Sequence, residues 1–306
     1  MRQILFIIIG LAIFLLIISC SSNEQPILKS SENMGLVEDS FENDPLIVNL
    51  KSLNDSLISQ THHESRGLFS FLKVLNELCV IAADVKGAVD GAKWGGSMLG
   101  VPGAVLGSVV VGATYSAMAG LCLDSRACVE NKISQKQIEL AYVNAKLNDE
   151  LIQNEQTENS SIMINIPSGY QSSLDAGVYH NITLKIIDED LPLEYGLEDG
   201  LTSDELSMLH SDDFTDKYNY SLNNPQVFSI DYMCENPTKE DRIIQLFLQA
   251  YQEYPAELED VGYLINRYIE LIEKDSQITD LQKGVVYSAL STAAYSTNYW
   301  YNRAQQ

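Results

Sequence analysis

GAVLGSVVVGATYSAMAG, residues 103–120, holds no charged side chain and few bulky ones, in a 306-residue chain of formal net charge −23. Small residues recur in it at every fourth position, which places them on one face of a helix. Such a face lets two helical backbones approach closely, as in dimers of membrane helices. The face consists of Ala104, Ser108, Gly112, Ser116 and Gly120.

A matching stripe of small residues lies just upstream, at Gly87, Gly91 and Gly95. Gly100 and Pro102 separate the two stripes, and proline does not continue a helix beyond its first turn. The sequence therefore predicts a helical hairpin packed stripe to stripe. Glycine inside a helix costs about 1 kcal/mol relative to alanine, so close packing must compensate. The segment resembles the glycine-zipper segments of membrane-active proteins and lipoproteins.

The two arms of this hairpin differ in charge. Lys86, Asp90 and Lys93 form a charged face on the first arm, and we expect Asp84 elsewhere on the surface. The second arm, residues 103–123, has no charge and at about 31 Å is long enough to cross a bilayer. Its few strongly apolar side chains each favour insertion by only tenths of a kcal/mol. We expect a buried soluble hairpin, with membrane insertion or a surface for a partner helix as alternatives.

The N-terminus predicts export from the cytoplasm. Arg2 precedes an apolar run, residues 4–18, that ends in Ile-Ile-Ser-Cys at Cys20, which is typical of a signal peptide. The ending resembles a bacterial lipobox, which implies lipidation of Cys20 and attachment to a membrane of the cell envelope. The periplasmic and surface faces stay open. An uncleaved anchor is the alternative, but the run is short of the roughly 20 residues that span a bilayer.

The acidic charge argues against nucleic acid as a partner, because both surfaces would be negative. Residues 188–216 contain eleven acidic residues and no lysine or arginine. Calcium would suit several carboxylates, but the D-x-[DN]-x-[DN]-G loop is absent. We predict a solvated acidic face with a short helix starting at the Thr202 to Glu205 capping box. No metal site or cofactor is expected.

Four cysteines follow Cys20 in a compartment that permits disulfides. They allow three full pairings, and the sequence does not choose among them. Zinc is the alternative, but no CxxC spacing occurs and the histidines are scattered. His62 and His63, beside Glu64, would point in different directions, which favours a solvated linker over a metal site. The four candidate disulfide cysteines are Cys79, Cys122, Cys128 and Cys234.

Two short motifs resemble elements of uncharacterised secreted proteins of Bacteroidota type. The first is Gly-x-x-His-Asn at Gly177, His180 and Asn181, and the second is Tyr-Ser-x-x-Tyr-Trp at residues 295–300. A histidine beside an asparagine could be catalytic, but no nucleophile shares a recognisable pattern with it. We interpret His180 as a helix-packing residue and expect no enzymatic activity. For the terminal aromatic cluster we favour a place in the hydrophobic core over a role in lining a ligand groove.

The predicted fold is all-α, a small-residue helical hairpin packed with a C-terminal helical bundle, behind a signal peptide and a flexible tether. A helix is expected from residue 129 to about 153. Helices after Thr238 and Thr279, with a break at Pro255, form the bundle. The expected regions are the signal peptide (1–20), tether (21–66), helices with the hairpin (67–155), an acidic, partly irregular region with short helices (156–236), and the bundle (237–306).

The predicted function is that of a lipid-anchored, non-enzymatic envelope or cell-surface protein. It would act through a protein partner or through self-association. The alternative is a membrane-active or pore-forming antagonistic protein that uses the hairpin of residues 83–122. The two hypotheses differ in whether that hairpin leaves the folded body.

Overall fold

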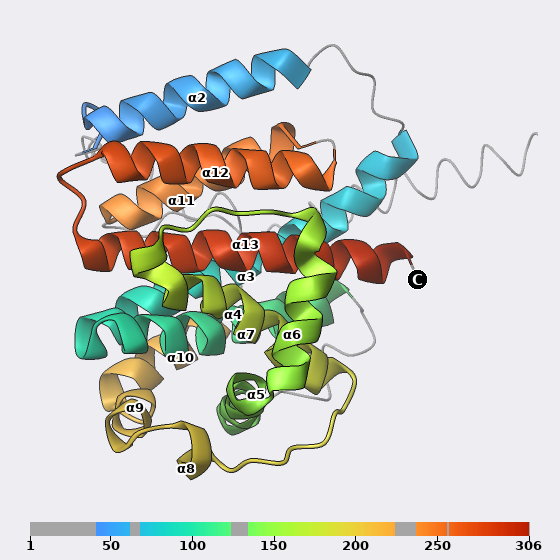
Figure 1. Cartoon of the computed structure of the whole chain (residues 1–306), viewed down its shortest axis with the longest axis vertical. Helices are drawn as coiled ribbons and strands as arrows, with labels where there is room; N and C mark the ends of the chain where they lie inside the picture. The colour runs from blue at the N-terminus through green and yellow to red at the C-terminus, as the bar shows by residue number, and fades with distance from the viewer. Residues whose placement is uncertain (1–40, 62–67, 124–133, 224–236, 256, 306) are drawn as a thin grey trace, which may run out of the picture. The chain divides into compact units, whose positions relative to one another are not determined.

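The structure is a computed structural model that describes residues 41–61, 68–123, 134–223, 237–255 and 257–305 (Figure 1). All regular secondary structure in these ranges is helical, which confirms the all-α class. The predicted signal peptide, Cys20 and the histidine pair lie outside the described residues. The α-helices are α2 (Pro45–Thr61), α3 (Leu68–Leu99), α4 (Val101–Leu123), α5 (Gln135–Leu147), α6 (Asp149–Glu158), α7 (Gln171–Asp188), α8 (Leu197–Gly200), α9 (Ser203–Leu209), α10 (Asp212–Asn223), α11 (Lys239–Glu253), α12 (Leu258–Lys274) and α13 (Asp280–Gln305).

Helices α3 and α4 form the predicted hairpin. Gly100 alone separates them, and its φ of +65° is a left-handed conformation that glycine adopts without steric cost. Pro102 lies in the first turn of α4, where its missing N–H breaks no helical hydrogen bond. The predicted turn residues therefore end one helix and begin the next.

The glycines of the hairpin bring the two backbones into direct contact. A Cβ on Gly91 would overlap the carbonyl of Gly107, one on Gly95 would overlap the carbonyl of Gly103, and one on Gly87 would lie 2.7 Å from the Val111 oxygen. Gly87, Gly91 and Gly95, the glycines of the predicted α3 face, all lie in the contact with α4. No side chain other than hydrogen fits at the two central crossings.

The face predicted for the second arm is wrong in part. Gly103 and Gly107 meet Gly95 and Gly91 of α3, whereas the predicted Ala104 lies beside Gly96 and the predicted Gly112 lies beside Gly87. The closest backbone contacts therefore use Gly103 and Gly107, each one position before a residue of the predicted series, together with Gly112 of that series. Ser108 and Ser116 are still fully buried. Gly120 lies in α4 beyond the residues whose side chains are described.

Helix α2 lies inside the range 21–66, which we expected to be a flexible tether, and for residues 45–61 that prediction is wrong. Leu46, Ile47 and Leu50 are buried, and α2 packs against α11 and α12 (Figure 1). Asp44 caps α2 by accepting from the Leu46 N–H at 2.9 Å, and it also pairs with Lys239 at 2.9 Å. The segment is polar in overall composition, but its apolar side chains gather on one side of the helix.

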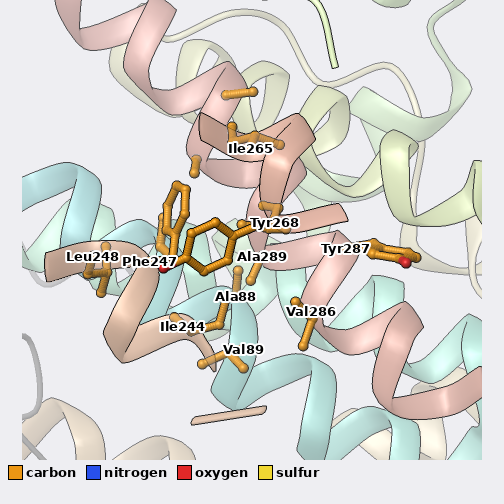
Figure 2. Packing of buried hydrophobic residues seen from close by; sticks show 14 of the residues in the cluster. Ala88, Val89, Ile244, Phe247, Leu248, Ile265, Tyr268, Val286, Tyr287 and Ala289 are labelled. Atoms are coloured by element: carbon orange, nitrogen blue, oxygen red, sulfur yellow. The ribbon is translucent and has the colours of Figure 1, made fainter. Parts of the chain in front are cut away.

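The C-terminal helices pack as a bundle around aromatic residues. Phe247 of α11 and Tyr268 of α12 meet edge to face, with ring centroids 5.5 Å apart. Figure 2 shows both rings in one cluster with Ala88 of α3 and Ala289 of α13. Helix α13 also packs along α3 and α7. The hairpin and the bundle therefore share one hydrophobic core.

Helix boundaries follow the predicted capping residues. The Thr202 and Thr238 side chains begin α9 and α11, and Thr279 hydrogen-bonds with Gln282 at the start of α13. The single helix expected over 129–153 is instead two helices, α5 and α6. They are divided at Asn148, whose side chain accepts from the Leu151 N–H at 3.0 Å.

Candidate functional site

Asp84 is the centre of a polar cluster in the middle of the fold. Its side chain is fully buried, and Oδ2 accepts hydrogen bonds from Ser296 Oγ and, at 3.1 Å, from Trp300 Nε1, both on α13. The expectation that Asp84 lies on the surface is wrong. Asp84 and Lys93 are nine residues apart, which is about two and a half turns of helix. They therefore lie on opposite faces of α3.

Burial sets the protonation behaviour of Asp84. It raises the pKa of this carboxyl above its ordinary value, because the charged form loses its hydration. Nearby His180 and the hydrogen bonds from Ser296 and Trp300 oppose this rise but do not cancel it. An acid in this place binds its proton more tightly in the folded chain than in the unfolded chain.

His180 and Asn181 of α7 extend the cluster. Both are fully buried, and His180 Nδ1 lies 3.2 Å from Asn181 Oδ1. Asn181 Nδ2 donates to Glu155 Oε1 at 3.0 Å and to the backbone carbonyl of Tyr295 at 2.6 Å. Asn181 therefore ties α7 to α6 and α13, and its amide nitrogen has no proton left for the histidine.

An ion pair closes the far side of the cluster. Glu155 of α6 is almost fully buried, and its Oε2 lies 2.6 Å from Lys185 Nζ, which also lies 2.5 Å from Glu158 Oε2. Burial alone would lower the pKa of Lys185, but the two carboxylates raise it above its ordinary value. The buried Glu155 charge thus has a cationic partner.

Close helix packing encloses these groups. A Cβ on Gly177 of α7 would lie 2.6 Å from the Ser291 carbonyl of α13, and one on Gly112 of α4 would lie 3.1 Å from His180 Cδ2. Asp84, His180 and Asn181 are each at 0% exposure. These three residues couple helices to one another and have no contact with solvent.

The other predicted residues are dispersed. Cys79 is exposed with a free thiol, whereas Cys122, Cys128 and Cys234 lie outside the described side chains, so their pairing stays a prediction. In the terminal aromatic cluster Tyr295 is buried and Tyr301 is exposed. Over the described ranges no three His, Cys, Asp or Glu side chains gather as a group that could hold a metal ion.

Sequence reasoning found His180 and Asn181 but missed their partners. The neighbours of Asp84 gave a local signal for burial, because Ala82, Ala83 and Val85 beside it are small or apolar. Glu155, Ser296 and Trp300 carried no such local signal, since they lie on other helices. Comparison with protein-family models, with curated proteins and with solved structures finds no match to this chain.

Proposed function

We propose that this chain is a lipid-anchored, non-enzymatic protein of the bacterial cell envelope that acts by binding a protein partner. The proposal is supported above all by the place of the hairpin. Residues 101–119 form the one helix, among those described, that is long and apolar enough to cross a membrane, and 78% of that segment is buried. Its apolar surface already serves as core, so membrane attachment falls to the expected lipid at Cys20.

The surface charge favours a cationic partner. Between α7 and α10 the exposed side chains are largely acidic, and Lys217 is the one lysine or arginine of residues 188–223. From other helices Arg303 pairs with Asp188, and Lys146 lies 3.9 Å from Glu205. An extended negative face speeds encounters with a basic surface and suppresses those with anionic ones. The exposed acids there are Asp188, Glu189, Asp190, Glu194, Glu198, Asp199, Asp204, Asp212, Asp213 and Asp216.

Substitution of the lipid-bearing residue tests the anchor. We expect Cys20→Ala to release the protein from membranes into the soluble fraction, because the one candidate span among the described residues is mostly buried. Fractionation followed by immunoblotting measures this, and protease shaving of intact cells separates the surface from the periplasm. Retention of Cys20→Ala in the membrane fraction would refute lipid as the sole anchor.

The second candidate function, a membrane-active hairpin, is favoured by its turn. Met98 and Val101 flank Gly100 and are each 40% exposed, and no charged residue occurs from 94 to 123. An exposed apolar turn on an uncharged helix is the part of the fold that would enter a bilayer first.

Dye release from liposomes separates the two functions. Under partner binding, the purified Cys20→Ala chain leaves loaded anionic and zwitterionic vesicles intact. Under membrane activity it leaks them, and Met98→Asp with Val101→Asp abolishes the leak, since both positions are exposed and the fold tolerates the change. Met163→Asp, at a 75% exposed position elsewhere, is the matched control. If the unchanged turn caused leakage and only the turn variant lost it, membrane activity would replace partner binding as the proposed function.

A further inference from the structure

The connection between α6 and α7 has the sequence pattern of a β-strand. It lies between the 3₁₀ turns η1 (Asn159–Ser161) and η2 (Ser168–Tyr170) and forms no regular secondary structure. In Figure 1 it crosses the fold between α12 and α13. A local pattern that disagrees with the surrounding helical fold is expected mainly at functional sites. β-Branched residues occupy every second position, as is typical of strands, at Ile162, Ile164 and Ile166.

The side chains of this connection alternate between core and solvent. Ile162 is buried, and Ile164 and Ile166 pack against the core that the hairpin and the bundle share. Met163 is 75% exposed, and Asn165 is exposed as well. Such alternation is that of an extended backbone, in which the N–H and C=O groups of successive residues also point to opposite edges. The connection therefore has two edges, and they differ.

Asn266 of α12 occupies the first edge. Its Nδ2 donates to the Met163 carbonyl at 3.0 Å, and its Oδ1 accepts from the Asn165 N–H at 2.7 Å. One amide that bonds residues two positions apart reproduces the contacts of a neighbouring parallel strand. Gly262, one turn earlier in α12, allows this approach, because a Cβ there would lie 3.0 Å from the Met163 oxygen. Helix α12 thus holds the connection in an extended form.

The second edge is open. The N–H and C=O groups of Ile164 and Ile166 form no hydrogen bond with any residue that the structure describes. Both residues are partly exposed, and backbone groups buried away from water are nearly always paired. These four groups therefore face solvent. Two donors and two acceptors in line are what the edge strand of a sheet offers to another chain.

We propose that residues 162–167 are a docking strand, which binds an extended and positively charged segment of the partner protein as a second strand. The docking strand rests on the proposed function, partner binding, and specifies the surface that performs it. An extended backbone presents the alternating donors and acceptors that Ile164 and Ile166 lack. A helical partner cannot do so, because its backbone groups are bonded internally. Met163, exposed on the outer face, would contact a side chain of the added strand.

The charges near the docking strand favour a basic segment. Residues 243–266 contain four acidic residues and no lysine or arginine. Of these acids, Glu259 is exposed and lies one turn before Gly262, on the side of α12 that approaches the docking strand. The next cation along α12, Arg267, is already paired with Glu270. A second copy of this chain, with its net charge of −23, would bring like charge to the same place.

Hydrogen exchange of the full chain in non-ionic detergent, resolved to single amides, tests the docking strand. The probe is a short peptide of alternating lysine and valine with blocked ends. We expect bound peptide to slow exchange at Ile164 and Ile166 by about tenfold or more, and to leave Asn165 unchanged because its N–H already bonds Asn266. Diffuse attraction to acidic groups would not protect every second amide. Unchanged exchange at Ile164 and Ile166 under saturating peptide would overturn the proposal.

Matched peptides separate backbone pairing from charge. The same peptide with every backbone nitrogen methylated keeps its charge but has no N–H to donate. A peptide with glutamate in place of lysine keeps the backbone and reverses the charge. We expect each to bind at least about tenfold more weakly than the lysine peptide, measured by fluorescence anisotropy. Equal binding of the methylated peptide would refute strand pairing, and equal binding of the glutamate peptide would refute a basic partner.

A pair of variants tests the same edge from the protein side. Ile164→Pro removes one N–H donor of the docking strand and should weaken the lysine peptide by about tenfold. Ile164→Val keeps the N–H and the branched side chain, so it should bind as the unchanged chain does. Circular dichroism checks that both variants fold. If Ile164→Pro does not fold, the exchange pattern of the unchanged chain decides.

Two further outcomes would each assign another surface. Peptide protection confined to α8, α9 and α10 would place the basic partner on the acidic face there, which overturns the docking strand but leaves partner binding standing. Slow exchange at Ile164 and Ile166 without peptide, together with a dimer in light scattering, would show that a second copy covers the strand, and it too would overturn the proposal. Failure of the proposed function itself is measured separately, by dye release.

Discussion

Gly91→Ala is expected to destabilise the fold by about 4 kcal/mol or more, although alanine is the better helix former by about 1 kcal/mol. The added methyl would overlap the carbonyl carbon and oxygen of Gly107, which are backbone atoms and have no rotamer by which to move aside. Helices α3 and α4 would have to separate along their whole contact. Chemical denaturation followed by circular dichroism measures the loss.

Gly284→Ala provides the matched control, because Gly284 is also a buried glycine inside a helix. A Cβ there lies 3.8 Å from Ser173 Oγ, an ordinary van der Waals contact. We expect a neutral effect or a gain of about 0.5–1 kcal/mol from helix propensity alone. If both alanine variants behaved alike, the glycines of the hairpin would not be required for close packing.

The second large effect is expected at α2. Leu50→Ala should cost about 2–5 kcal/mol, because the Leu50 side chain is fully buried and its removal leaves a cavity beside α11 and α12. Val48→Ala, two residues away and 46% exposed, should change the unfolding free energy by no more than about 0.5 kcal/mol. Thermal unfolding of both variants is the measurement.

This pair of substitutions separates a core helix from a tether. If residues 45–61 were only a tether, Leu50→Ala would change the unfolding free energy as little as Val48→Ala does. A difference between them would place the start of the folded body before α2, which leaves at most residues 21–44 as the span between the expected lipid and the domain. With the proposed lipid at Cys20, that length would limit the distance between the folded body and the membrane.

The prediction of the hairpin succeeded because its determinants are local. Gly100 and Pro102 end one helix and begin another through their own backbone geometry, and Thr238 caps α11 with its own hydroxyl. The prediction failed where a residue's role depends on another helix. Asp84 looked like one more surface charge, because its two donors, Ser296 and Trp300, follow more than 200 residues later.

The amino-acid sequence by itself determined that the chain is helical, where most of its helices begin and end, and that two of them pack through glycine. These properties depend on backbone conformation, capping and periodicity within a few residues. Only the tertiary structure decided which residues of α4 meet the glycines of α3, that α2 belongs to the core, and that Asp84 and His180 lie together in the buried interior. Such contacts join distant segments, and their energies depend on burial, which no local pattern encodes.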